Sequence, residues 1–138
     1  MVFTNEGRKA ILETLLKNDS LPTDISLHLF TNDVTPSISD SYAGGELVEM
    51  SGNGYTSIVV ARNQWTSAVS NDIVTLSMAE QVFTFTAGTP KTVYGYFITI
   101  NNNGTRVILC ADKFTSPLTV QYEGDKIGIE VVLRPVSA

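Results

Sequence analysis

The sequence predicts a mainly β protein, an antiparallel, jelly-roll-like β-sandwich of about eight strands with one N-terminal α-helix. Short segments in which apolar and polar residues alternate recur between residues 25 and 134, and turn-forming residues separate them. Val, Ile and Thr, the β-branched types that favour strands, are abundant. No helical segments interrupt these strands, so a parallel α/β sheet is disfavoured. The length of 138 residues predicts a single domain, 1–138.

Residues 4–18 are predicted to form the helix. Four apolar residues recur at helical spacing and define a stripe: Ile11, Leu12, Leu15 and Leu16. Thr4 is a suitable N-cap, and Gly7 lowers the helix propensity by about 1 kcal/mol. The segment 18–22, which ends in proline, stops the helix. The apolar stripe suits packing on the chain's own sandwich or on a neighbouring molecule, and the sequence leaves both open.

The sandwich is predicted to occupy residues 25–134. Its strands are expected at residues 25–30, 55–62, 73–77, 82–86, 92–100, 105–111, 118–122 and 127–134. Between two of them, Asn103 and Gly104 predict a tight hairpin, because both tolerate positive φ. The segment 31–54 has no periodic pattern, and a loop of this length in a small domain is usually functional.

The composition excludes several classes of function. A net charge of −5 opposes attraction to a nucleic-acid backbone. No apolar run is long enough to span a membrane, and no basic start followed by an apolar run suggests export, so we expect a soluble protein made inside a cell. The single cysteine, Cys110, and the single histidine, His28, provide neither an internal disulfide nor a soft metal site. We therefore expect no cofactor, no metal, no nucleic acid and no membrane partner.

Catalytic signals are weak. His28 is the one candidate base for a nucleophilic triad, and we interpret it as a surface or hydrogen-bonded strand residue. Cys110 lies among strand aliphatics and is interpreted as a small buried hydrophobe. A hydrolase that uses loop carboxylates ranks last, because any acidic loop offers such pairs. The carboxylates concerned are Asp33, Asp40, Glu46 and Glu49. The prediction is a protein that is not an enzyme.

Aromatic residues suggest a binding module as an alternative. Alternation along residues 92–100 predicts that Tyr94 and Tyr96 share one face, where they could stack on a sugar. This is the basis for a carbohydrate-binding or receptor-binding β-sandwich. Trp65 suits either a core anchor or the centre of an interface.

Several segments together resemble small virion proteins of tailed bacteriophages, which consist of an N-terminal helix and a β-sandwich. No single segment is a reaction signature, and their order along the chain carries the resemblance. The segments are Thr4-Asn5-Glu6-Gly7-Arg8, Leu29-Phe30-Thr31-Asn32-Asp33-Val34-Thr35-Pro36, Gly54-Tyr55 followed by Trp65, Val93-Tyr94-Gly95-Tyr96-Phe97, Ala111-Asp112-Lys113-Phe114 and Gly124-Asp125-Lys126-Ile127.

The resemblance implies a non-enzymatic capsid cement or decoration protein, located in the virion. Its partners would be the major capsid protein, whose neighbouring subunits it bridges, and further copies of itself, with a trimer favoured. A tail or head-fibre component is the alternative. We predict that the contact surface combines the loop 31–54 with the polar side of the helix and one aromatic residue. The candidate residues are Glu6, Lys9, Glu13, Asp33, Tyr42, Glu46, Glu49 and Trp65.

Overall fold

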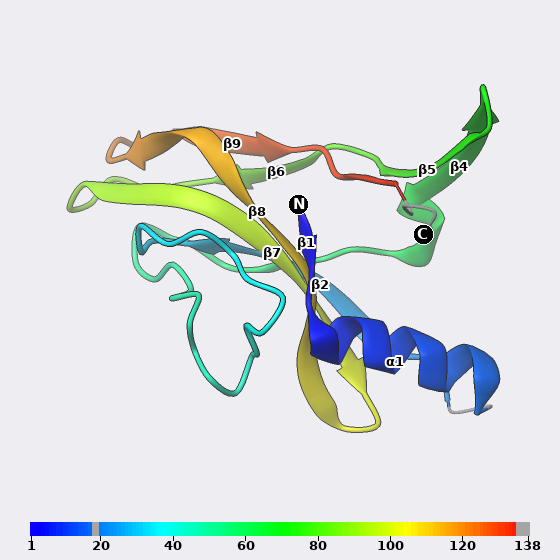
Figure 1. The fold of residues 1–138 in the computed structure, drawn as a ribbon. Coiled ribbons are helices and arrows are strands. Elements are labelled where there is room, and N and C mark those ends of the chain that lie inside the picture. The colour runs from blue at the N-terminus through cyan, green and yellow to red at the C-terminus, as the bar shows by residue number, and fades with distance from the viewer. Residues whose placement is uncertain (18–19, 135–138) are drawn as a thin grey trace.

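The computed structural model describes residues 1–17 and 20–134, and its strands form two layers (Figure 1). One layer is a five-stranded antiparallel sheet in the order β1-β8-β7-β2-β3. The other contains a three-stranded sheet, β10-β5-β4, and a two-stranded sheet, β6-β9. The bounds are β1 Val2–Phe3, β2 Thr23–Phe30, β3 Ile58–Val59, β4 Trp65–Ser70, β5 Ile73–Met78, β6 Gln81–Thr84, β7 Lys91–Asn102, β8 Thr105–Val120, β9 Lys126–Ile129 and β10 Val132–Leu133, with a 3₁₀ turn at Arg62–Gln64. The predicted mainly β, sandwich-like fold with one N-terminal helix is confirmed.

The main core lies between the two layers. Alternate residues of each strand face inward, as the period of two requires. The five-stranded sheet contributes Leu27, Leu29, Val93, Ile98 and Cys110, and the opposite layer contributes Met78, Phe83, Ile127, Ile129 and Leu133. Burial of these apolar side chains is the principal source of stability for the fold.

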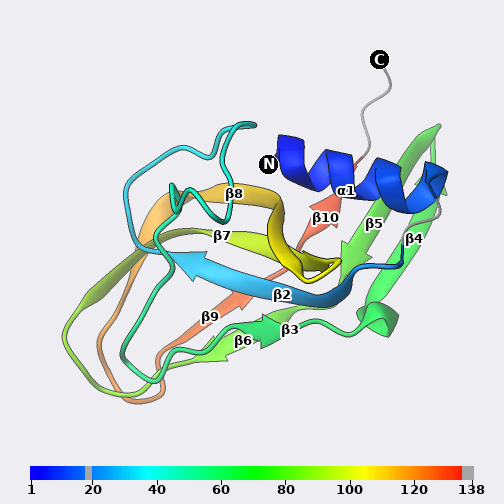
Figure 2. The same cartoon turned by 90° about the horizontal axis from the view of Figure 1, so that it is seen from below.

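Helix α1, Asn5–Leu16, lies on the outer face of the five-stranded sheet (Figure 2). Thr4 is its N-cap, as predicted, and accepts a hydrogen bond from the Gly7 N–H at 3.0 Å. The buried residues of the helix are small, namely Gly7 and Ala10, and Ala10 packs with Ile100 and Val107. Contact through small residues lets the helix axis come close to β8.

The predicted apolar stripe of the helix faces away from the sandwich. Leu12, Leu15 and Leu16 are 56, 72 and 79 % exposed. These leucines therefore take no part in the contact between the helix and the sheet. Of the two alternatives for the stripe, packing on the chain's own core is therefore wrong for these three residues.

Several strand boundaries differ from the prediction. Residues 105–111 and 118–120 belong to one long strand, β8, because β7 pairs with both parts, with an irregularity between them. Residues 127–134 divide into β9 and β10, which belong to different sheets. Most of residues 55–62 is not strand, whereas β4 was not predicted, because its mostly small and polar side chains show no apolar alternation. The Asn103-Gly104 hairpin is confirmed, with φ values of 51° and 82°.

The loop 31–54, called the long loop below, is irregular, as predicted, and packs against part of the outer face of the sheet. Its Leu47 packs with Phe30, Phe97 and Ile108 in a second apolar cluster. Near its end, Glu49 forms a bridge to Phe30 of β2. This bridge brings the Glu49 side chain beside the polar residues of the sheet's outer face.

Candidate functional site

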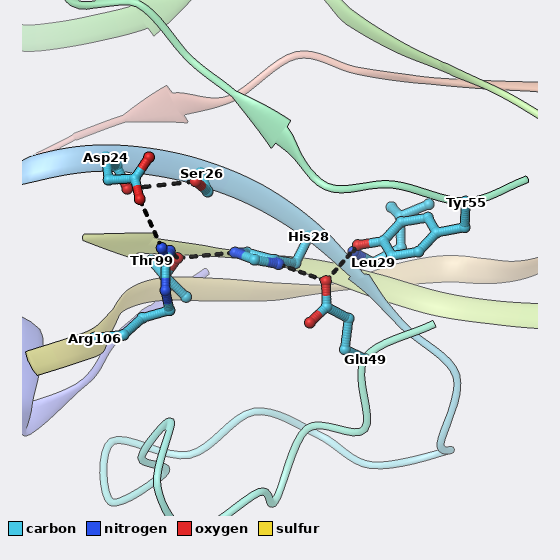
Figure 3. Close-up of polar contacts among 8 residues, drawn as sticks. All are labelled: Asp24, Ser26, His28, Leu29, Glu49, Tyr55, Thr99 and Arg106. Carbon is cyan, nitrogen blue, oxygen red and sulfur yellow. Dashed lines mark hydrogen bonds and ion pairs between the residues drawn. The ribbon is translucent and has the colours of Figure 1, made fainter. Parts of the chain in front are cut away.

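His28 is the centre of a buried polar network on the outer face of the five-stranded sheet (Figure 3). The side chain lies on β2, is 4 % exposed, and stacks on the Phe97 ring at a centroid distance of 4.7 Å. Its Nδ1 lies 2.7 Å from Glu49 Oε1. Its Nε2 lies 2.8 Å from Thr99 Oγ1 on β7. His28 is therefore a hydrogen-bonded strand histidine, one of the two forms that the sequence indicated.

The network continues at both ends (Figure 3). Arg106 of β8 donates from Nη1 to Thr99 Oγ1 at 2.7 Å and from Nη2 to Asp24 at 2.9 Å. At the other end, the Tyr55 hydroxyl donates to Glu49 Oε1 at 2.9 Å and accepts the Leu29 N–H at 3.1 Å. Three strands and two loop segments are thus joined through one chain of side chains.

The directions of these bonds agree with a neutral His28 imidazole. A proton on Nδ1 is donated to the Glu49 carboxylate, which leaves Nε2 as an acceptor. The Thr99 hydroxyl can then donate to Nε2 while its oxygen accepts from Arg106. In this tautomer both ring nitrogens of His28 and the Thr99 hydroxyl have partners, as buried polar groups require.

The surroundings shift the pKa of two members of the network. Burial disfavours the charged form of Glu49, but the hydrogen bond from His28 and the charge that His28 carries when protonated, helped by the Tyr55 hydroxyl and the Arg106 charge, keep its pKa below the usual value. Burial raises the pKa of Tyr55, and the neighbouring Glu49 charge adds to the effect. A carboxylate and a neutral phenol are the resulting states near neutral pH.

A hydroxyl, an imidazole and a carboxylate in this order also describe a nucleophilic triad. Thr99, however, is 0 % exposed, and its oxygen already accepts the Arg106 bond. A substrate carbonyl needs access to the attacking oxygen, and the full burial of Thr99 denies that access. The geometry favours a structural clamp that holds the long loop on the sheet.

Of the network residues, the sequence singled out only two. His28 was the one candidate base, and Glu49 was a loop carboxylate and a candidate contact residue. Asp24, Tyr55, Thr99 and Arg106 were not predicted as members. Each belongs to a segment whose local pattern is ordinary, and the partners lie far apart in the chain, 71 residues in the case of His28 and Thr99. No local signal in the sequence could have identified them.

The predicted contact residues of the helix and the long loop lie close together. The Glu6 carboxylate accepts bonds from the Tyr42 N–H, at 2.9 Å, and from the Ile108 N–H. Asn5 donates from its N–H to the Ile38 carbonyl at 2.8 Å. Glu6 is therefore a half-buried link between α1, the long loop and β8, rather than a free charge on the polar side of the helix.

The other predicted charged residues also have partners. Lys9 and Glu13 form an i, i+4 ion pair at 2.7 Å. Lys113 binds Asp33 at 2.5 Å, and the Ser41 N–H donates to Glu46 at 3.1 Å. Asp40, named as a hydrolase carboxylate, accepts the Ser37 N–H at 2.8 Å. Asp40 and Glu46 therefore hold the loop's own conformation, whereas Asp33 links the loop to β8.

The predicted tyrosine platform is wrong. A register shift between Val93 and Gly95 places an irregularity in β7 and reverses the faces. Tyr94 consequently packs against the cluster of Phe30 and Phe97, whereas Tyr96 is buried in the main core beside Phe114. Strict alternation, which the prediction assumed, does not hold across a bulge.

Trp65 has the core role, one of the two that the sequence left open. It packs against the main core and also lines an apolar pocket of about 280 Å³. The other lining residues are Ile25, Arg62, Leu76, Leu109 and Leu133. The pocket lies where β4 and β5 leave the sandwich.

No family model, curated protein sequence or solved structure matches the chain. Within residues 1–17 and 20–134, no group of three or more His, Cys, Asp and Glu side chains is arranged to hold a metal ion. In the same part of the chain, no helix has the length and apolar character that crossing a membrane requires. The function must therefore be argued from the surfaces of the molecule.

Proposed function

We propose that this chain is a non-enzymatic structural protein of a bacteriophage virion, a capsid cement protein that binds the outer shell and stabilises contacts between capsid subunits. The observation that carries the proposal is the exposed apolar stripe of Leu12, Leu15 and Leu16 on a helix whose opposite side is held on the sheet. A contiguous exposed apolar stripe on a small protein marks a protein contact.

The long loop adds exposed apolar side chains near the N-terminal end of the same helix. Ile38 and Tyr42 are exposed, and both lie in the part of the loop that Asn5 and Glu6 tie to the helix. Helix and loop thus present one preformed surface, which lowers the entropic cost of binding. Many copies of such a modest contact on a symmetric shell give strong total binding.

The first test is the location of the protein. Antibody against this chain, with gold label, is applied to gradient-purified particles from the lysate in which the chain is made. Gold over the heads supports the cement role. Gold confined to the tail contradicts that role and favours the tail or head-fibre alternative, and protein that stays unbound to particles contradicts both.

The second test concerns the surface. The variant L12Q/L15Q/L16Q is compared with V82Q, an exposed valine on β6 in the opposite layer. We expect the triple variant to stop co-sedimenting with particles that lack the protein, and V82Q to bind normally. Circular dichroism shows that both variants are folded. Normal binding of the triple variant would contradict the assignment of this surface.

A further inference from the structure

The hairpin of β4 and β5, here called the hairpin arm (residues 65–78), projects beyond the sandwich (Figure 1). Its register pairs Trp65 with Met78, Ser67 with Leu76 and Val69 with Val74. Residues paired across two strands share a face of the hairpin. One face of the arm therefore carries five apolar side chains and one serine, Ser67.

This apolar face begins in the core and continues without a second layer. Met78 is buried, Leu76 and Val74 are 37 and 48 % exposed, and Val69 near the tip is 72 % exposed. Toward its tip, the arm therefore has an apolar face on which no second sheet packs. Exposed apolar area of this kind favours association in water.

The apolar pocket lies at the base of the arm. Its volume of about 280 Å³ exceeds the roughly 150 Å³ that holds a benzene molecule, so two aliphatic side chains would fit. Arg62 contributes the one charge among its lining residues and is exposed. The pocket is therefore a concave apolar site with a cation among its lining residues.

We infer that the occupant of this pocket is a second copy of the chain, whose arm inserts Val69 and Val74. The arm is convex and apolar, and the pocket is concave and apolar, so each copy carries both halves of the contact. Asp72, at the turn of the arm, is the one charged residue in the sequence 65–78. Insertion brings it toward Arg62 of the other copy, which gives charges of opposite sign.

Charge also explains why association would use this face. Two copies with a net charge of −5 repel each other over most of their surfaces. The arm carries a single charge, and its edge strand β4 has none of the lysines or prolines that usually keep edge strands apart. Each copy carries both surfaces, so the contact closes into a two-fold symmetric dimer when each arm enters the pocket of the other copy. It does not depend on binding to a capsid.

The test is sedimentation equilibrium of the full chain up to about 1 mM, with variants at exposed positions. We expect wild type to self-associate and V69S/V74S to be monomeric. The matched control is I73S, because Ile73 is 53 % exposed on the opposite face of the same arm, paired with Ser70. I73S should associate like wild type.

A charge exchange tests the predicted pair. D72K and R62E should each weaken self-association by about threefold, and the double variant D72K/R62E should restore it. Far-UV circular dichroism confirms that each variant is folded. Wild type that stays monomeric throughout, or equal effects of V69S/V74S and I73S, would overturn the inference. Absence of rescue in the double variant would overturn the proposed orientation of the arm.

Discussion

The Nδ1 atom of His28 lies 2.7 Å from Oε1 of Glu49, a contact between residues 21 positions apart that holds the end of the long loop on the sheet. The imidazole stacks on Phe97 and reaches Thr99 with its other nitrogen. A long irregular loop would ordinarily be mobile. Here a buried network fixes it, and with it the surface that we propose for binding.

Thr99 tests the importance of this network for stability. In T99V the shape is nearly kept but the hydroxyl is lost, so His28 Nε2 and Arg106 Nη1 lose a shared partner. We expect the free energy of unfolding to fall by about 1–3 kcal/mol in urea denaturation. T84V, at an exposed strand position, should change it by less than about 0.5 kcal/mol. Equal effects of the two variants would contradict the clamp.

The lowered pKa of Glu49 predicts acid sensitivity. A carboxylate with a lower pKa in the folded state stabilises the protein above its unfolded pKa, near 4.5, and this contribution is lost as the pH falls through the folded value. In E49Q the free energy of unfolding should therefore depend less on pH below about 5.

Urea denaturation at a series of pH values measures this dependence. E130Q, which removes an exposed carboxylate, serves as the control and should keep the wild-type slope. Glu13 and Asp125 also have lowered pKa values, so some slope should remain in E49Q. A slope in E49Q equal to that of wild type would show that the Glu49 carboxylate is not stabilised by folding.

Replacement of Gly7 by alanine should destabilise the protein, although alanine has the higher helix propensity. G7A improves the intrinsic propensity by about 1 kcal/mol, but a Cβ there would lie 2.6 Å from the Leu109 carbonyl oxygen and 2.7 Å from that of Ile108. Backbone atoms of β8 cannot move aside easily, so we expect G7A to lower the melting temperature. L15A, at an exposed position of the same helix, should leave it nearly unchanged. A raised melting temperature in G7A would mean that the helix does not approach β8 this closely.

Cys110 should be unreactive in the folded protein. The thiol is fully buried in the main core, and burial raises its pKa to about 12. A disulfide reagent at pH 8 should therefore label the native chain negligibly and label the urea-unfolded chain to one thiol per molecule. Rapid labelling without urea would show that the core opens around β8.

Some features of this protein could be predicted because their causes are local. Thr4 caps the helix whatever lies beyond it, and Asn103-Gly104 forms a tight turn because both residues accept positive φ. The alternation of Ile127, Ile129 and Leu133 marked the core face, although the strand divides between two sheets. The strand Trp65–Ser70 was missed because one of its faces is polar and the other has no layer to cover it.

The sequence by itself determined the class of fold, the position of the helix and the hairpin turn. Tertiary structure alone decided that Tyr94 and Tyr96 face opposite ways, that the leucine stripe stays exposed, and that His28 meets Thr99. The physical reason is the distance along the chain between the residues that interact. Propensities and periodicities act between residues a few positions apart, whereas a bulge, the docking face of a helix and a buried network depend on register between strands that are distant in the chain.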